Sequence, residues 1–242
     1  MRSLLRKMNS PVVLDIGANI GNHLLPILPL VKKAIAFEPQ SNAFDKLKRS
    51  IEKNEFTNCL IGNYGLGHED KNLEFHENLL GNNGRSSFLK QESSNKNEIV
   101  LNLPIRNGDA VLDHMEINKL DFIKIDVEGF EFEVFKGIEE NIKKYSPVIL
   151  MEWDAHTTGK DFFNNDVFNN ILSGYKVIAL EEKDHWWIRN KFWSIRSIVN
   201  RNLLGKFKVI NFDYSLNYNN ILLFKKEHQN IVDATINNTT YE

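Results

Sequence analysis

The sequence has almost no cysteine, no long apolar run and no excess of charge of one sign. Cys59 is its single cysteine, which excludes an intramolecular disulfide and a cysteine-based zinc site and favours a reducing, cytoplasmic compartment. No window approaches the roughly 18 apolar residues of a membrane span, and the N-terminal stretch MRSLLRKMNS lacks the apolar core of a signal peptide. The formal net charge of -2 gives no electrostatic reason to expect a nucleic-acid partner. We therefore expect a soluble protein without stable membrane insertion.

What the chain does have is enough apolar sequence for one large domain. Its 242 residues, 42% of them apolar, fit a single α/β domain over 1–242. Short apolar runs predict seven strands, at 11–15, 33–38, 59–64, 121–126, 147–152, 175–181 and 219–226. Helical patterns lie between them, at 22–31, 41–53, 109–118 and 131–144, the first shortened or kinked by two prolines. This alternation predicts a mostly parallel, Rossmann-like sheet with helices on both faces and an antiparallel last strand.

Three segments depart from that alternation. Between 66 and 103, alternating stretches at 72–76, 86–89 and 99–103 predict a β-hairpin excursion after the third strand, where a helix would be usual. Residues 185–208 are rich in tryptophan, phenylalanine, lysine and arginine. We interpret this insert as a cap. Four roles stay open for it: a lid over the acceptor, a binding surface for an anionic sugar, a contact with a membrane surface, or a helix that covers the sheet edge. The tail 230–242 is predicted to be disordered.

The first strand ends in the glycine turn of VVLDIGANIG. Gly17 permits a tight turn, and Gly21 permits close approach of a ligand and of the following helix. Asn19 stands where the dinucleotide fingerprint needs its second glycine, which disfavours an NAD-dependent oxidoreductase. Asp15 precedes the turn and would repel a pyrophosphate, but it suits a ligand with an ammonium group, such as the methionine part of S-adenosylmethionine (SAM).

A second acid follows the second strand. Glu38 lies at the end of the run KAIAFE, where a carboxylate can accept both hydroxyls of a ribose. An acid, a glycine turn and an acid at the next strand end together predict a nucleoside cofactor with a cationic part.

The motifs DIGANIG, AFEP, GNYGLG, IRNGDAVL, DFIKIDVEGFEFEVFKGIEE and ILMEW occur in order between about residues 11 and 153. In this order and spacing they resemble the FkbM family of methyltransferases, and KIDVEGFE is the most specific of them. The resemblance implies a class I SAM-dependent methyltransferase fold, with 11–153 as the SAM-binding core. It also implies an enzyme that usually methylates oxygen atoms of sugars, polyketides or other metabolites.

The resemblance assigns roles to residues by position. Glu38 should bind the ribose hydroxyls, and the segment around Asn63 and Gly65 should flank the adenine. The family's signature block coincides with Asp126, Glu128 and Gly129. Asp109 takes the place of the first acid of a family pattern, although Gly108 and Ala110 depart from that pattern on either side. The complete set of predicted cofactor-binding residues is Asp15, Gly17, Ala18, Asn19, Gly21, Glu38, Pro39, Asn63, Gly65, Asp109 and Asp126.

Methyl transfer to a hydroxyl requires alignment of the two reactants, exclusion of water and a base. His156, just after the fifth strand, is a candidate base because histidine titrates near neutrality. Asp126 and Asp154 are rival bases, and Glu152 is a further candidate catalytic residue at the same edge. Lys124, within the fourth strand, is better explained by a salt bridge to a neighbouring acid.

Asp126, Glu152 and Asp154 also offer oxygen ligands for a divalent cation, but their spacing does not establish one, and no metal is predicted. The leading function is SAM-dependent O-methylation of a sugar or another small-metabolite hydroxyl. The alternatives are a SAM- or nucleotide-binding module without methyl transfer, and an NAD-dependent oxidoreductase.

Overall fold

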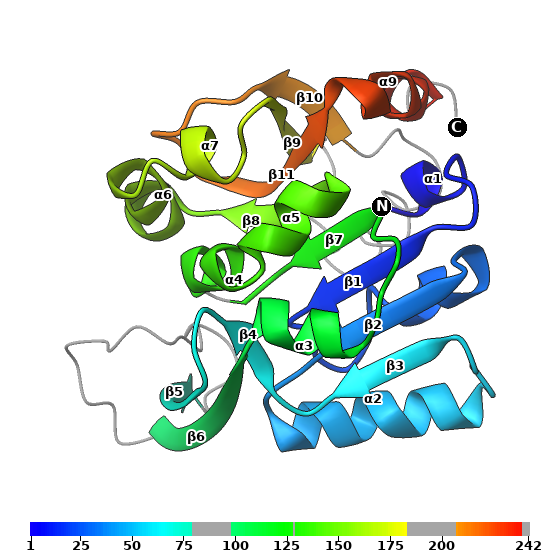
Figure 1. Ribbon diagram of the computed structural model, residues 1–242, viewed down its shortest axis with the longest axis vertical. Helices are drawn as coiled ribbons and strands as arrows, with labels where there is room; N and C mark the ends of the chain where they lie inside the picture. The colour runs from blue at the N-terminus through cyan, green and yellow to red at the C-terminus, as the bar shows by residue number, and fades with distance from the viewer. Residues whose placement is uncertain (79–97, 128, 183–206, 239–242) are drawn as a thin grey trace, which may run out of the picture.

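The computed structural model describes residues 1–78, 98–127, 129–182 and 207–238. One sheet of eight strands forms its centre, in the order β10-β9-β11-β8-β7-β1-β2-β3 (Figure 1). The strands are β1 Val12–Ile16, β2 Lys33–Phe37, β3 Cys59–Gly62, β7 Phe122–Ile125, β8 Val148–Trp153, β9 Tyr175–Glu182, β10 Phe207–Asn211 and β11 Tyr218–Lys225. The five strands from β3 to β8 are parallel, and β11 is antiparallel to both of its neighbours, β8 and β9. The α/β fold with an antiparallel last strand is therefore confirmed.

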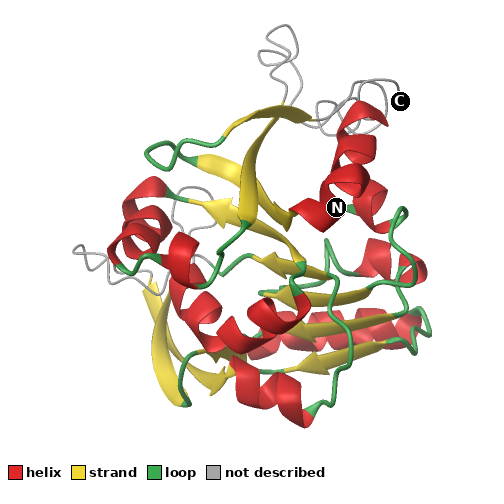
Figure 2. Cartoon of the chain, turned by 45° about the horizontal axis from the view of Figure 1, so that its top comes forward, coloured by secondary structure: helices red, strands yellow, loops and turns green. Residues whose placement is uncertain are grey.

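Helices cover both faces of this sheet (Figure 2). One face packs against α3 Gly108–His114, α4 Glu131–Gly137, α5 Glu139–Tyr145, α6 Lys160–Asn164 and α7 Val167–Asn170. The other face packs against α1 Arg2–Leu5, the 3-10 helix η1 Leu25–Leu30, α2 Ser41–Lys53 and α9 Gln229–Asn238. Two shorter turns complete the described part, the π-helical turn η2 Ala155–Gly159 and the 3-10 turn η3 Lys226–His228. No helix of the described residues is both long and apolar enough to cross a bilayer.

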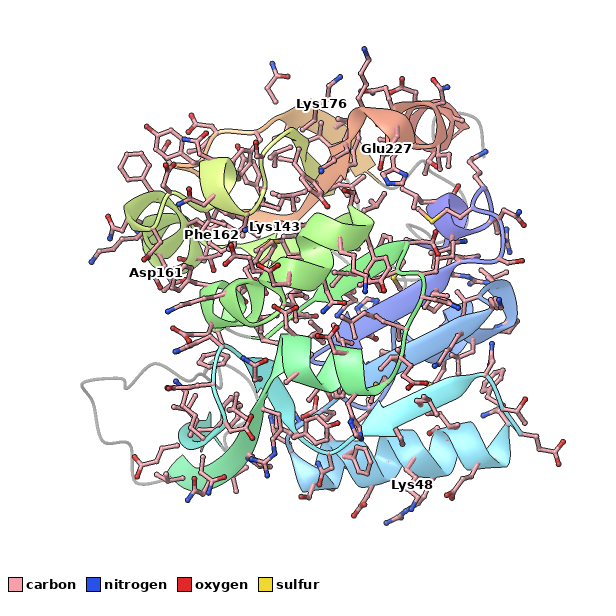
Figure 3. The ribbon with its side chains drawn as sticks, in the orientation of Figure 1. Lys48, Lys143, Asp161, Phe162, Lys176 and Glu227 are labelled. Atoms are coloured by element: carbon pink, nitrogen blue, oxygen red, sulfur yellow. The ribbon has the colours of Figure 1, made fainter. Side chains whose placement is uncertain are left out.

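The two faces have separate apolar cores because successive side chains of each strand point to opposite sides. Leu14 and Ile123 belong to the α4 side, and Val13 and Phe122 belong to the η1 side. Phe162 of α6, labelled in Figure 3, is fully buried in the first core, 4.9 Å from the ring centre of Phe135. Both layers therefore hold the central strands in place and fix where each strand ends.

The predicted excursion after the third strand is a small second sheet. It contains β4 Gly65–Gly67, β5 Lys71–Asn78 and β6 Glu98–Asn107, in the order β4-β6-β5. The strands β5 and β6 pair antiparallel from Lys71 with Ile105 to Asn78 with Glu98, and β4 pairs parallel with β6. The predicted stretch 86–89 lies outside the described residues.

Four predictions of single elements differ from the structure. The sheet has an eighth strand, because 207–211 pairs antiparallel with 178–182. The end of the predicted insert 185–208 therefore belongs to a strand, and residues 183–206 lie outside the described part. The helix predicted over 22–31 is reduced to η1, with Pro29 inside it. The helix predicted over 131–144 breaks at Ile138 into α4 and α5. Finally, 229–238 forms α9, and its Val232 is buried in the second core, so the prediction of disorder was wrong for that part of the tail.

Candidate functional site

The glycine turn after β1 lies between the ends of its two neighbouring strands. Gly17, Asn19 and Gly21 all have positive φ angles, of 79°, 49° and 89°. The backbone N–H groups of Gly17 and Ala18 both donate to the carbonyl oxygen of Phe37 at the end of β2. On the other side, a Cβ atom on Gly17 would lie 1.9 Å from the carbonyl oxygen of Asp126. The turn is thus held against β2 and β7 at the carboxyl edge, where open α/β sheets bind ligands.

Glu38 joins this turn to the loop after β2. Its side chain is buried, with 5% of the residue exposed. Oε2 accepts the N–H of Asn19 and Oε1 accepts the N–H of Gln40, both at 2.8 Å. Burial raises the pKa of Glu38, and these two hydrogen bonds oppose the shift. Each carboxylate oxygen keeps a second acceptor position, which is what two ribose hydroxyls require.

Asn63 supports the same loop from β3. Its Nδ2 donates to the carbonyl oxygens of Glu38 and Pro39, at 2.9 and 3.2 Å. Its Oδ1 accepts the hydroxyl of Ser41 at 3.1 Å. Gly65 is buried, and a Cβ atom there would lie 2.7 Å from Cδ1 of Ile105. Asn63 therefore shapes the loop that carries Glu38, and the adenine contact foreseen for this segment stays a prediction.

A buried lysine lies between two of the predicted acids. Lys124 is paired in register with Asp15, and its Nζ is 3.6 Å from Asp15 Oδ1 and 3.0 Å from Asp126 Oδ2. The salt bridge predicted for Lys124 is confirmed. Within the described residues neither carboxylate oxygen of Asp15 accepts a hydrogen bond, and Asp15 is only 1% exposed. The side chain of Asp126 is 37% exposed, so Asp126 is the acid that a ligand would meet first.

His23, at the start of the segment leading to η1, faces this cluster. Its pKa is lowered, first by desolvation of the ring and then by the Lys124 ammonium, while Asp15 and Asp126 oppose the shift. The Lys124 ammonium thus acts on His23 as well as on the two carboxylates.

The predicted residues after β8 lie at the same edge. Glu152 is half-buried near the end of the strand. Asp154 Oδ1 accepts the N–H groups of His156 and Thr157, at 2.9 and 3.0 Å, so its carboxylate caps η2. The side chain of His156 is exposed on this turn. Among the residues that the structure describes, no group of three or more histidine, cysteine, aspartate or glutamate side chains has the geometry of a metal site.

Asp109 has contacts of a different kind from those of Glu38. It lies in the first turn of α3, and its carboxylate accepts the N–H groups of Glu140 and Asn141 at 3.1 Å and the Asn141 side-chain amide at 2.7 Å. These bonds satisfy the free N–H groups at the start of α5. These contacts are those of a helix cap, and the cofactor contact foreseen for Asp109 stays a prediction. Glu128 of the signature block lies outside the described residues.

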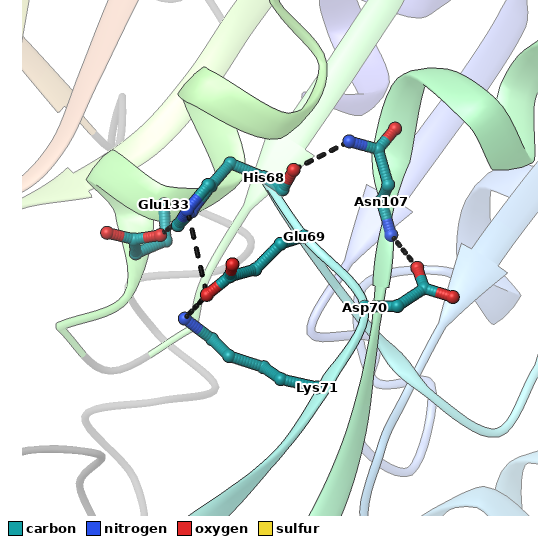
Figure 4. Close-up of polar contacts among 6 residues, drawn as sticks. All are labelled: His68, Glu69, Asp70, Lys71, Asn107 and Glu133. Carbon is teal, nitrogen blue, oxygen red and sulfur yellow. Dashed lines mark hydrogen bonds and ion pairs between the residues drawn. The ribbon is translucent and has the colours of Figure 1, made fainter.

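Two polar groups of the described part were not found from the sequence. Glu131, the last acid of KIDVEGFE, is buried and accepts the hydroxyl of Thr158 at 2.7 Å. Its only sequence signal is its place in the motif, since its partner follows 27 residues later. His68 pairs with Glu133 and so ties the small sheet to α4 (Figure 4). The cluster in that figure contains His68, Glu69, Asp70, Lys71, Asn107 and Glu133.

The sheet order and the acids along its carboxyl edge define a Rossmann-like class I methyltransferase fold. The model of the methyltransferase FkbM domain matches residues 15–177, and the chain belongs to this family.

Individual relatives match over part of their length. The chain is 29% identical over 151 residues to hexuronic acid methyltransferase AglP of Haloferax volcanii, covering 62% of this chain and 59% of that protein. It is 26% identical over 179 residues to methyltransferase sdnD of Sordaria araneosa, covering 60% of this chain and 68% of that protein. The crystal structure of methyltransferase FkbM from Methylobacillus flagellatus superposes with a TM-score of 0.51 at 16% identity, over 89% of this chain and 43% of that chain. The chain thus spans less than two thirds of AglP and of the solved chain.

Proposed function

We propose that this chain is a SAM-dependent methyltransferase that methylates a hydroxyl group of a sugar, of the hexuronic acid class. The observation that carries the proposal is the position of Glu38. Its two carboxylate oxygens each accept one backbone N–H and face the glycine turn between β1 and β2. A ribose diol placed there would donate to the remaining acceptor positions of the same carboxylate.

The residues around the turn fit the rest of SAM. Gly17 and Gly21 let the turn pack tightly against Asp126 and Leu47, and Asp126 offers a partly exposed carboxylate to the ammonium group. The buried pair of Asp15 and Lys124 lies next to Asp126, with Lys124 Nζ 3.6 Å from Asp15 Oδ1 and 3.0 Å from Asp126 Oδ2. When bound, SAM supplies a methyl group activated by a sulfonium. Apart from holding it, the chain has to orient the acceptor, exclude water and remove one proton.

His156 is the residue that we assign to proton removal. It is exposed at the carboxyl edge directly after β8, two residues beyond Asp154. Asp154 is less suited, because Oδ1 is already bound to two backbone N–H groups of η2. Asp126 is also less suited, because its Oδ2 is 3.0 Å from the Lys124 ammonium. The imidazole would take the hydroxyl proton of the acceptor while the acceptor oxygen displaces the methyl group from sulfur, and S-adenosylhomocysteine would leave.

The sugar class rests on the similarity to hexuronic acid methyltransferase AglP. The match covers 62% of this chain. The family model separately spans residues 15–177, which include the carboxyl edge. A hexuronic acid is therefore the first acceptor to test.

The deciding experiment measures binding and transfer separately. Calorimetry should detect binding of SAM and of S-adenosylhomocysteine but not of NAD. Incubation with SAM and glucuronic acid glycosides should then give a product heavier by one methylene group. Binding of NAD without a response to SAM would favour an oxidoreductase. Binding of SAM without transfer to any sugar, polyketide or phenol in a broad screen would favour a cofactor-binding module.

A further inference from the structure

The turn that carries His156 is unusual in its backbone and in how firmly it is held. Residues Ala155–Gly159 form a π-helical turn, a conformation that is rare and is frequently found at functional sites. Asp154 binds the turn from its N-terminal end, through the N–H groups of His156 and Thr157. Asn217 binds it from the loop before β11, with Oδ1 accepting the N–H of Ala155 at 2.7 Å. A five-residue turn is thus fixed by polar side chains from two directions.

Glu131 holds the same turn from a third direction. The Thr158 hydroxyl donates to Glu131 Oε2 at 2.7 Å, and the Gly129 N–H donates to Oε1 at 3.2 Å. Both partners of the first bond are only 3% exposed. Because Glu131 begins α4, this bond joins the segment after β7, which starts at Asp126, to the segment after β8.

The hydrogen bond between Glu131 and Thr158 is an energetically unfavourable way to join two segments. A buried carboxylate costs stability unless it is well compensated, and a pair of apolar side chains of similar volume often serves packing equally well. Within the described residues no cationic side chain forms an ion pair with Glu131. Desolvation raises the pKa of Glu131, and the bond from Thr158 is the largest effect that opposes it. Packing alone therefore does not account for a carboxylate at this position.

We propose that Glu131 and Thr158 are positioning residues, which fix the π-helical turn so that the His156 ring is held ready for the acceptor hydroxyl. The proposal rests on the proposed function, because it takes His156 as the proton acceptor. Within the described residues neither Glu131 nor Thr158 forms a hydrogen bond with the glycine turn or with Glu38, so cofactor binding should not depend on the pair.

Four variants separate positioning from folding. Thr158→Val removes the hydroxyl at nearly constant volume, and Thr158→Ser keeps the hydroxyl as the matched rescue. The double variant Glu131→Leu with Thr158→Val replaces both partners by apolar groups, so neither is left buried without a hydrogen-bond partner. Glu131→Gln removes the charge but can keep the bridge, because the Thr158 hydroxyl can accept from the amide.

Three measurements are made on each folded variant. Amide hydrogen exchange at 156–159 should be faster by about tenfold or more in Thr158→Val and in the double variant, and near wild type in Thr158→Ser and Glu131→Gln. The Kd for SAM should stay within about twofold of wild type in all four. Methyl transfer to a glucuronic acid glycoside should lose kcat by about tenfold or more in the two variants with faster exchange, with little change in the KM for SAM.

The proposal is overturned if exchange at 156–159 stays slow in both variants that lack the bridge. It is also overturned if Thr158→Ser loses methyl transfer as fully as Thr158→Val does. A third contradicting result would be methyl transfer at the wild-type level in a variant whose turn exchanges faster. A failure of the proposed function gives a different result. In that case wild-type protein would bind no SAM, while the exchange rates would still report whether Glu131 and Thr158 hold the turn.

Discussion

Lys124 of β7 and Asp15 of β1 face each other on neighbouring parallel strands, with 3.6 Å between Nζ and Oδ1, and both are buried. Burial alone would lower the pKa of Lys124, but the charges of Asp15 and Asp126 outweigh it, and the pKa is raised. Burial raises the pKa of Asp15, and Lys124 is the main influence against that shift. The lysine is therefore the group that allows a carboxylate to lie in the middle of the sheet beneath the glycine turn.

Replacing Lys124 by methionine should strongly destabilise the protein, because it leaves Asp15 buried without its cation. We expect the free energy of unfolding to fall by about 3–5 kcal/mol, as measured by urea unfolding at pH 7. Lys119→Met is the matched control, since Lys119 pairs with Asp121 at 3.1 Å but has a side chain that is 44% exposed. It should lose no more than about 1 kcal/mol. Equal losses in the two variants would contradict the role given to Lys124.

Glu38→Gln should weaken SAM binding. The amide keeps a single acceptor oxygen and no charge, so it cannot bind two backbone N–H groups and a diol together. Hydrogen bonds to charged groups contribute about 1.5–3 kcal/mol each, which corresponds to a Kd raised roughly 10- to 100-fold. Calorimetric titration with SAM gives the Kd, and Glu52→Gln on the exposed side of α2 is the control. An unchanged Kd for Glu38→Gln would remove the ribose contact from the proposal.

Gly17→Ala and Gly174→Ala separate backbone strain from loss of space. The two glycines have nearly equal φ angles, 79° and 78°, but a Cβ atom at Gly17 meets the Asp126 carbonyl at 1.9 Å, and one at Gly174 meets nothing within 4 Å. Strain alone should cost Gly174→Ala about 1–2 kcal/mol. Gly17→Ala should lose about 1–3 kcal/mol more through the clash and should also lose SAM binding. Urea unfolding and calorimetry provide the two measurements, and similar losses in both variants would count against the close approach at Gly17.

Glu131→Gln should alter the pH dependence of stability. The pKa of Glu131 is raised in the folded protein, above the unfolded value of about 4.3. A carboxyl group whose pKa is higher in the folded than in the unfolded protein contributes fully to stability below pH about 4. That contribution is lost as the pH rises through the pKa of the folded state. The variant should therefore gain in melting temperature relative to wild type between acidic and neutral pH. Thermal unfolding from pH 4.5 to 8 tests this, and a constant difference across that range, as expected for Glu52→Gln, would contradict it.

His156→Asn should slow methyl transfer without affecting the cofactor. The ring is exposed on η2 and, among the described residues, has no hydrogen bond to the glycine turn, so SAM affinity and stability should stay at wild-type levels. Loss of a general base lowers kcat by about 10²- to 10⁴-fold. The control is His114→Asn at the exposed end of α3, which should leave the rate unchanged. If kcat survives in His156→Asn, Asp126 becomes the next residue to test as the base.

The sequence predicted the central strands well because each is an apolar run buried on both faces. The predictions failed where contacts between residues far apart in the sequence determine the structure. The helix expected over 131–144 breaks at Ile138, next to Gly137, which lies so close to β4 that a Cβ atom there would be 2.0 Å from the Gly67 carbonyl oxygen. The helix at 229–238 forms in a polar tail because Val232 packs into the core that also contains Leu4 and Leu5. Neither contact has a local sequence signal.

The same distinction applies to the site. Asp15, Glu38 and Asp126 were found because acids at the ends of parallel strands share one edge. The partners of Glu131 and His68 follow 27 and 65 residues later in the chain, and no spacing rule connects them. The pairing of Lys124 could be foreseen in kind, since a buried lysine needs an acid, but its contact with two carboxylates required the register of β1 with β7.

The segment from Lys124 to Glu131 has one further consequence. Lys124 lies on the face of β7 that includes Phe122 and packs toward η1, whereas Glu131 lies in α4 on the opposite face. The short segment between them therefore connects the two layers that cover the sheet. Under the proposed function it links Asp126, at the cofactor, to Glu131, which holds the turn of His156. A protein engineer who wants a different acceptor should leave Lys124, Asp126 and Glu131 unchanged and vary the residues around the π-helical turn after β8.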